Sequence, residues 1–166
     1  MKSVFLVLKR KFVSFLRRGL FFKVGFIPTW FLLGAARAMV LVFAFARLAP
    51  FLGRKVDKEA WDQPMQPLNV SCINKAQKIS RLIVTTVRYC PWNANCLAQA
   101  IVARFWLGVC GVPYRIYFGL RRDNTGLKAH AWVCSGSVFV SGGNGFKEHS
   151  VVGCYGVNNE TTLGDK

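Results

Sequence analysis

Apolar residues recur at three- and four-residue steps in several stretches of the chain, which is the spacing of amphipathic helices. The clearest stretch covers residues 96–109, where Leu97, Ile101 and Phe105 share one face. The Gly-Val-Pro sequence at residues 111–113 then ends the pattern. The same spacing predicts further helices over residues 3–19, 29–48 and 74–89, the second of them with Thr29 as its N-cap.

The hydrophobic period changes from helical spacing to alternation after residue 113. Residues 114–120, 127–134 and 137–141 alternate as strands, and polar turns separate them. Helices followed by an antiparallel meander predict an α+β fold, and 166 residues suit one domain with a sizeable core. We expect this organisation: basic apolar N-terminal helices packed on the core at 1–55, a polar linker at 56–73, the core at 74–157 and a polar tail at 158–166.

Composition and charge limit the partners. With 52% hydrophobic and 18% charged residues, the chain buries enough surface to fold and is not intrinsically disordered. Its net charge of +16 suggests nucleic acid or an anionic membrane, but the helix-turn-helix, RNP and zinc-finger patterns are missing, so we expect no nucleic-acid partner. Lys23, Arg37 and Arg47 interrupt the N-terminal apolar stretches, so we do not expect a membrane span. Two roles for the N-terminal helices therefore stay open. They cover the core and a partner protein, or they make a peripheral contact with a membrane.

The six cysteines form no CxxC pair, so we expect no zinc site. The absence of a GxxxxGK[ST] loop predicts no nucleotide cofactor either. The apolar run at residues 4–8 is too short for a signal peptide. We therefore expect a cytoplasmic protein whose thiols stay reduced.

One cysteine and one histidine are candidates for a catalytic pair. Cys96 follows a Pro- and Asn-rich turn and opens a helix, where free backbone N–H groups favour a thiolate. A helix that travels about 20 Å away and a strand that returns about 23 Å bring His130 level with Cys96. Such a pair can carry out nucleophilic acyl transfer, with the Cys96 N–H and the side chain of Asn93 or Asn95 as oxyanion donors. The competing interpretation is a structural thiol and an ordinary strand histidine.

Neighbours of His130 on the same strand face extend the candidate site. Trp132 is either core or a wall beside the nucleophile, and Cys134 is a candidate for the cleft lining. His149 is expected to be a surface histidine.

Four short motifs then occur in order. They are Cys96-Leu97-Ala98-Gln99-Ala100, Gly111-Val112-Pro113, Ile116-Tyr117-Phe118-Gly119-Leu120 and Lys128-Ala129-His130-Ala131-Trp132-Val133. Over residues 28–155 the chain resembles the transglutaminase-like B2 proteins of lasso peptide biosynthesis. The resemblance implies a papain/transglutaminase-like cysteine peptidase core, with a nucleophile helix packed on an antiparallel sheet, that removes the leader from a ribosomally made precursor peptide. It implies Cys96 as nucleophile and His130 as base.

The chain departs from this family at the third catalytic position. The family has an acid a dozen or so residues after the histidine, whereas residues 140–146 here contain no carboxylate. Asn144 is the expected orienting residue, Ser141 and Glu148 are weaker candidates, and a dyad without an orienter is also open. The resemblance further implies three partners: the precursor peptide, a separate leader-recognition protein and the ATP-consuming lasso cyclase. The alternatives are an acyl transferase that uses the same thioester, and a non-catalytic basic interaction or membrane-surface protein.

Overall fold

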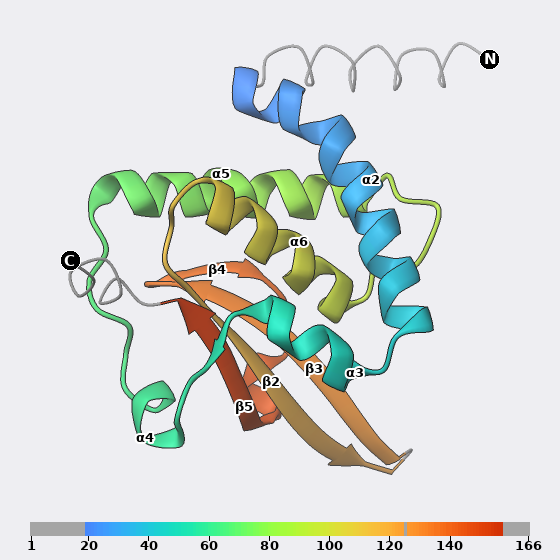
Figure 1. Cartoon of the computed structure of the whole chain (residues 1–166), viewed down its shortest axis with the longest axis vertical. Coiled ribbons are helices and arrows are strands. Elements are labelled where there is room, and N and C mark those ends of the chain that lie inside the picture. Colours follow the sequence, from blue (N-terminus) through green and yellow to red (C-terminus); the bar gives the residue numbers. More distant parts are fainter. Residues whose placement is uncertain (1–18, 125, 158–166) are drawn as a thin grey trace.

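The computed structural model describes residues 19–124 and 126–157 (Figure 1). Its helices are α2 (Leu20–Val42), α3 (Phe45–Leu48), η1 (Ala49–Leu52), α4 (Lys58–Trp61), α5 (Val70–Val87), α6 (Cys96–Val109) and η2 (Phe146–Glu148). Its strands are β1 (Arg54–Lys55), β2 (Tyr114–Asp123), β3 (Gly126–Ser135), β4 (Val138–Ser141) and β5 (Ser150–Val157). The helix expected over residues 3–19 and the tail at 158–166 lie outside the described residues.

The strands form a single antiparallel sheet in the order β1-β5-β2-β3-β4. The three predicted strands are confirmed as β2, β3 and β4, but β5 and the short β1 were not predicted. β5 lies between β1 and β2, with Cys154 opposite Tyr117. Two glycines interrupt the apolar alternation of β5, and Gly156 is needed there because a Cβ would lie 2.5 Å from the Tyr114 carbonyl oxygen.

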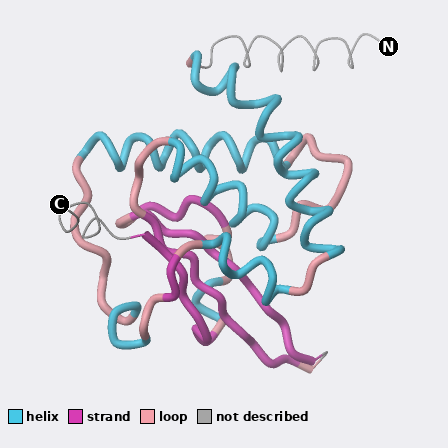
Figure 2. The backbone as a smooth tube through the Cα atoms, in the orientation of Figure 1, coloured by secondary structure: helices cyan, strands magenta, loops and turns pink. Residues whose placement is uncertain are grey.

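The long helices α2, α5 and α6 lie together on one side of the sheet (Figures 1 and 2). The core between them is fully buried, with Ile116 and Val133 from the sheet and Ala98, Val102 and Ala103 from α6 at 0–1% exposure. Small alanines on α6 let this helix lie close to the strands. The α+β class is confirmed, and the helix that begins at Cys96 packs on the antiparallel sheet as expected.

The predicted break before Thr29 is wrong, because α2 runs through Pro28 without interruption. Pro28 lies on the exposed side of the helix. Thr29 is not an N-cap but is buried in mid-helix, where its Oγ1 donates to the Gly25 carbonyl at 2.6 Å and accepts from Trp106 Nε1 at 2.9 Å. A Cβ at Gly25 would lie 2.8 Å from the Leu82 side chain, so close packing on α5 keeps the helix continuous.

The helix expected over residues 74–89 begins earlier, at Val70. Asn69 is its N-cap, because Asn69 Oδ1 accepts a hydrogen bond from the Cys72 N–H at 2.8 Å. The stretch at 56–73 that was expected to be a linker therefore contains α4 and the first turn of α5.

Candidate active site

Cys96 is the first residue of α6 and is half-buried. Asn95 caps this helix, since Asn95 Oδ1 accepts from the Ala98 N–H at 3.0 Å. That oxygen is therefore committed to the cap. The other N–H groups of the first turn, including that of Cys96, have no acceptor within the helix, and they favour negative charge at this end.

Contacts with α2 hold the turn that precedes Cys96. The ring of Trp92 in this turn packs edge to face on Trp30, with centroids 4.5 Å apart. Trp30 Nε1 also donates to the Tyr89 carbonyl at 3.2 Å. A Cβ at Gly34 would lie 3.0 Å from Trp92, so α2 approaches the turn closely. The N-terminal helix thus positions the thiol, although it lies far from Cys96 in the sequence.

His130 lies on β3, opposite Gly119 of β2. A Cβ at Gly119 would lie 2.8 Å from both Trp132 and His149, so this glycine makes room for the side chains beside His130. The His130 Nε2 atom lies 2.8 Å from the carbonyl oxygen of Gly142. A carbonyl only accepts, so Nε2 carries the proton and Nδ1 is the ring atom that can accept one.

The backbone at Gly142 requires a glycine. Its φ is +67°, and a Cβ would lie 2.2 Å from the Ala131 carbonyl oxygen. No other residue fits without moving the strand beside it. The position of the carbonyl that holds His130 therefore depends on this glycine.

Cys96 and His130 line one cavity of about 510 Å³. Val84 and Val87 of α5, with Arg88 at the C-cap of that helix, form another wall, and residues 141–144 lie at the end of β4 and after it. The structure therefore places Cys96 and His130, which are distant in the chain, in the wall of the same cavity. None of the lining residues is an aspartate or glutamate.

The three sequence candidates for an orienting group lie in different places. Asn144 is exposed and lines the cavity, and Ser141 lines it with a buried hydroxyl that has no hydrogen-bond partner among the described residues. Glu148 is exposed, pairs with Arg121 and does not line the cavity. The group at His130 Nε2 is the Gly142 carbonyl, which the sequence analysis missed because a backbone oxygen leaves no residue-type signal. The Gly-Gly pair at 142–143 was the available hint of an unusual turn.

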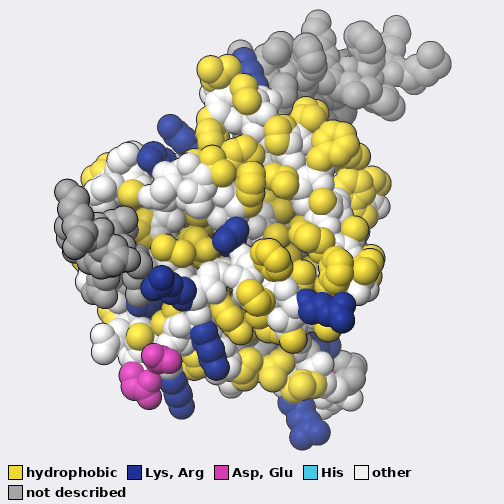
Figure 3. Space-filling view, viewed as in Figure 1, with side chains coloured by type: hydrophobic (Ala, Val, Ile, Leu, Met, Phe, Trp, Pro, Cys, Tyr) yellow, Lys and Arg dark blue, Asp and Glu magenta, His cyan; other side chains and the backbone are white. Residues whose placement is uncertain are grey.

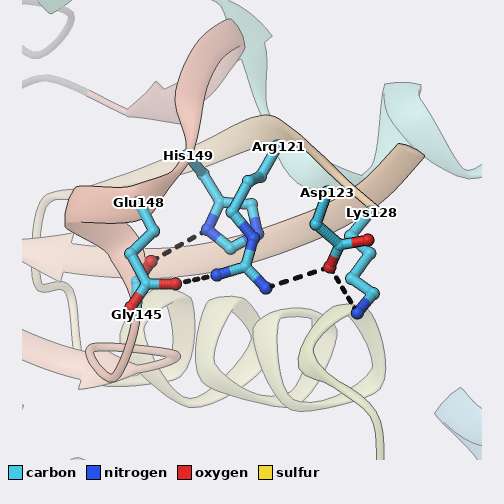
Figure 4. Close-up of polar contacts among 6 residues, drawn as sticks. All are labelled: Arg121, Asp123, Lys128, Gly145, Glu148 and His149. Atoms are coloured by element: carbon cyan, nitrogen blue, oxygen red, sulfur yellow. Dashed lines mark hydrogen bonds and ion pairs between the residues drawn. The ribbon is translucent and has the colours of Figure 1, made fainter. Parts of the chain in front are cut away.

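His149 is half-buried beside the site instead of lying free on the surface as expected. Its ring centroid lies 5.1 Å from that of His130, and its Nδ1 donates to the Gly145 carbonyl at 2.8 Å. Figure 4 shows the Arg121 guanidinium beside this ring, with ion pairs to Glu148 and Asp123. The charged side chains of this region are thus paired with one another.

Trp132 is buried and Cys134 is half-buried on the strand of His130. Trp132 is 4% exposed, stacks on Tyr117 at an interplanar angle of 13°, and has its centroid 5.9 Å from that of His130. Cys134 lines a separate cavity of about 620 Å³ with both aromatic rings. Burial raises the pKa of the Cys134 and Cys154 thiols to about 12. Those two thiols stay protonated at neutral pH, whereas Cys96 is the cysteine in the wall of the His130 cavity.

No group of three or more His, Cys, Asp or Glu side chains that could hold a metal ion occurs in the part of the chain that the structure describes.

Comparisons with known proteins agree with this geometry. A search of the curated proteins and a search of the solved structures find no match to the chain. The family model of the transglutaminase-like superfamily matches residues 39–151, a range that includes Cys96, His130 and the whole cavity wall between them. Because that match covers more than half of the 166 residues, the chain belongs to the transglutaminase-like superfamily.

Proposed function

We propose that this chain is a cysteine peptidase that removes the leader from a lasso precursor peptide, with Cys96 as nucleophile and His130 as general base. One observation carries the proposal. The thiol and the imidazole line one cavity, and the Gly142 carbonyl holds the imidazole in the tautomer whose Nδ1 can accept a proton.

The first half of the reaction uses the free Nδ1 atom. His130 takes the proton of Cys96, and the sulfur attacks the carbonyl carbon of the scissile peptide bond. The carbonyl oxygen becomes negative, and the N–H of Cys96, the first residue of α6, donates to it. The C–N bond then breaks, the imidazolium gives its proton to the leaving amine, and a thioester remains on Cys96.

The second half consumes water. His130 takes a proton from a water molecule, whose oxygen attacks the thioester carbonyl. The C–S bond breaks, the thiol regains a proton from the imidazolium, and the new carboxylic acid leaves. An amine in place of water would give acyl transfer through the same thioester. Asn144, on the cavity wall, is our candidate for a second group that orients the ring when substrate is bound.

The cavity wall fits a peptide without basic residues at the cut site. Val84, Val87 and Phe139 provide apolar surface, and Arg88 provides a cation. No carboxylate in the wall offsets that cation, so a lysine or arginine beside the scissile bond is disfavoured. The choice of a lasso precursor rests on the four ordered motifs of the sequence. It implies a separate leader-recognition protein and a cyclase, which would carry the ATP dependence. We place the reaction in the cytoplasm, where a thiol nucleophile stays reduced.

The test is leader release followed by mass spectrometry. The chain is incubated with the precursor peptide and the recognition protein, and Cys96→Ala is compared with Cys90→Ala, a half-buried thiol of the same turn. Both wild type and Cys90→Ala should release the leader as a free acid, and Cys96→Ala should not. Undiminished release by Cys96→Ala refutes the proposal. A product that carries an added amine instead of hydroxide assigns the chain to acyl transfer.

A further inference from the structure

The outward face of α2 is apolar along its whole length. Seven residues recur there at three- and four-residue steps, and we call them the outer stripe: Leu20, Val24, Ile27, Phe31, Ala35, Ala38 and Val42. All seven are exposed, and the five larger ones are 59–77% exposed. At 100° per residue the outer stripe lies opposite the buried stripe of the same helix, which contains Phe22, Gly25, Thr29, Leu33 and Ala36.

No charged residue interrupts the outer stripe. Both charged residues of α2, Lys23 and Arg37, fall on the same flank of the helix wheel. In Figure 3 apolar side chains gather over α2, while the acidic side chains in view lie at the opposite lower corner of the molecule. A contiguous exposed apolar stripe of this length normally marks a site that an apolar partner covers.

A membrane crossing does not fit the way α2 is packed. The helix is long and apolar enough to span a bilayer by length and composition. Its inner stripe, however, is held by the core, with Leu33 at 0% and Ala36 at 1% exposure and Gly25 against Leu82. If α2 crossed a bilayer, its buried side chains would leave the core, and the turn before Cys96 would lose its contacts with α2. A helix that stays packed can only lie flat, with an outer stripe about 34 Å long against the surface.

The charges around α2 indicate which apolar surface it meets. Residues 19–55 contain five lysines and arginines and no acidic residue. After α2, the exposed side chains of Arg47, Arg54 and Lys55 continue this positive charge. Exposed aromatic rings, Phe43 and Phe45, extend the apolar area at the same end. Apolar and aromatic residues beside unpaired positive charge fit the interface of an anionic bilayer.

We propose that the outer stripe of α2 docks flat on anionic lipid, so that the protein is peripheral to a membrane. Lys23 and Arg37 reach the lipid headgroups from the flank, and the apolar side chains enter the acyl boundary. This inference does not depend on the proposed peptidase reaction, because no residue of the outer stripe lines the cavity of Cys96 and His130.

The test is co-sedimentation of the full chain with vesicles of phosphatidylglycerol and phosphatidylcholine. The double variant Ile27→Gln/Phe31→Gln should bind at least about tenfold more weakly than wild type, because two exposed apolar side chains no longer enter the lipid. The matched control, Val109→Gln/Leu127→Gln, changes two equally exposed apolar residues elsewhere, at 65% and 67% exposure, and should bind as wild type. Lys23→Gln/Arg37→Gln should weaken binding and reduce its salt dependence, and pure phosphatidylcholine should bind wild type poorly.

Three results overturn the inference. The first is wild type that stays in the supernatant with anionic vesicles, and the second is Ile27→Gln/Phe31→Gln that binds them as tightly as wild type. The third is a wild-type dimer in sedimentation equilibrium without lipid that becomes monomeric in Ile27→Gln/Phe31→Gln, with no vesicle binding by either. That outcome assigns the outer stripe to a second copy of the chain.

Discussion

The imidazole of His130 is held through its Nε2 atom by the backbone carbonyl of Gly142, at 2.8 Å. In a catalytic triad the third member chiefly fixes the tautomer and orientation of the histidine. A backbone carbonyl does this as an acceptor without bringing a charge into the site. The relationship explains how a chain without a carboxylate at this position can still keep Nδ1 free to take a proton from a thiol.

The first prediction concerns Asn144, which lines the cavity beside this hydrogen bond. Because the Gly142 carbonyl keeps the His130 ring in the tautomer that is protonated at Nε2, Asn144→Ala should lower kcat for leader cleavage by less than about tenfold. Steady-state kinetics on the precursor peptide measure this directly. A loss of a hundredfold or more would mean that the Asn144 amide, and not the carbonyl, orients the ring.

The second prediction is that Gly142→Ala damages both stability and cleavage. The added Cβ would meet the Ala131 carbonyl oxygen, in a backbone conformation that disfavours alanine. We expect a loss of about 3 kcal/mol or more in the free energy of unfolding, with activity reduced even where the variant is folded. Urea unfolding and the cleavage rate at a temperature below the transition measure the two effects.

Gly145→Ala is the matched control for the clash. Gly145 also has a positive φ, at +81°, but nothing lies within 4 Å of its added Cβ. Its cost should be the conformational strain alone, about 1 kcal/mol. Equal losses from the two variants would show that crowding at Gly142 is unimportant.

The third prediction is a loss of stability in alkali caused by the thiols of Cys134, which is half-buried, and Cys154, which is buried. Burial raises the pKa of Cys134 and Cys154 from 9.0 to about 12. The folded state therefore keeps these protons above pH 9 while the unfolded state loses them. Stability is unaffected below pH 9 and falls as pH rises from about 9 to about 12, by about 2 kcal/mol per thiol at about pH 10.5.

Urea unfolding at pH 7.5 and at higher pH checks this window. The double variant Cys134→Ala/Cys154→Ala should be less stable at neutral pH because it leaves space in the core. Its stability should nevertheless fall less steeply with pH than that of wild type. Parallel curves for the two proteins would contradict the assignment of the alkaline loss to these thiols.

The fourth prediction concerns Trp30, which connects α2 to the turn before Cys96. Trp30→Ala removes the ring contact with Trp92 and the hydrogen bond to the Tyr89 carbonyl. We expect a loss of about 2 kcal/mol or more in unfolding free energy and a lower kcat, because the turn that carries the nucleophile loosens. Ile27→Ala, on the exposed side of α2, should change neither quantity appreciably. Wild-type kcat in Trp30→Ala would show that α2 does not position the thiol.

Local periodicity was enough to predict the elements around the site. The helix at residues 96–109 and the strands β2, β3 and β4 follow from spacing alone, because each has a clear alternation or helical period and is followed by a polar turn or a glycine. The superfamily match agrees with the fold class derived from them. The positions of Cys96 and His130 at one cavity follow from the lengths of these elements.

Contacts between distant parts of the chain determine the features of the fold that periodicity does not predict. A proline directly before Thr29 usually marks the start of a helix. Here the packing of Gly25 on Leu82 and the hydrogen bonds of Thr29 keep α2 continuous across this point. β5 was missed because Gly153 and Gly156 interrupt its alternation and its pairing with β2 is non-local. The role of the Gly142 carbonyl and the place of His149 depend on chain segments that meet only in the folded protein.

The account rests on His130 acting on the thiol of Cys96, and the alkylation rate of that thiol tests it most directly. Purified wild type and His130→Ala are treated with iodoacetamide at pH 7, and modification of each cysteine is followed by peptide mass spectrometry. The half-buried thiols Cys72 and Cys110 serve as internal controls. We predict that Cys96 reacts at least about tenfold more slowly in His130→Ala, because no base takes its proton, while the control thiols are unchanged. An equal rate of Cys96 alkylation in the two proteins would contradict the catalytic pair.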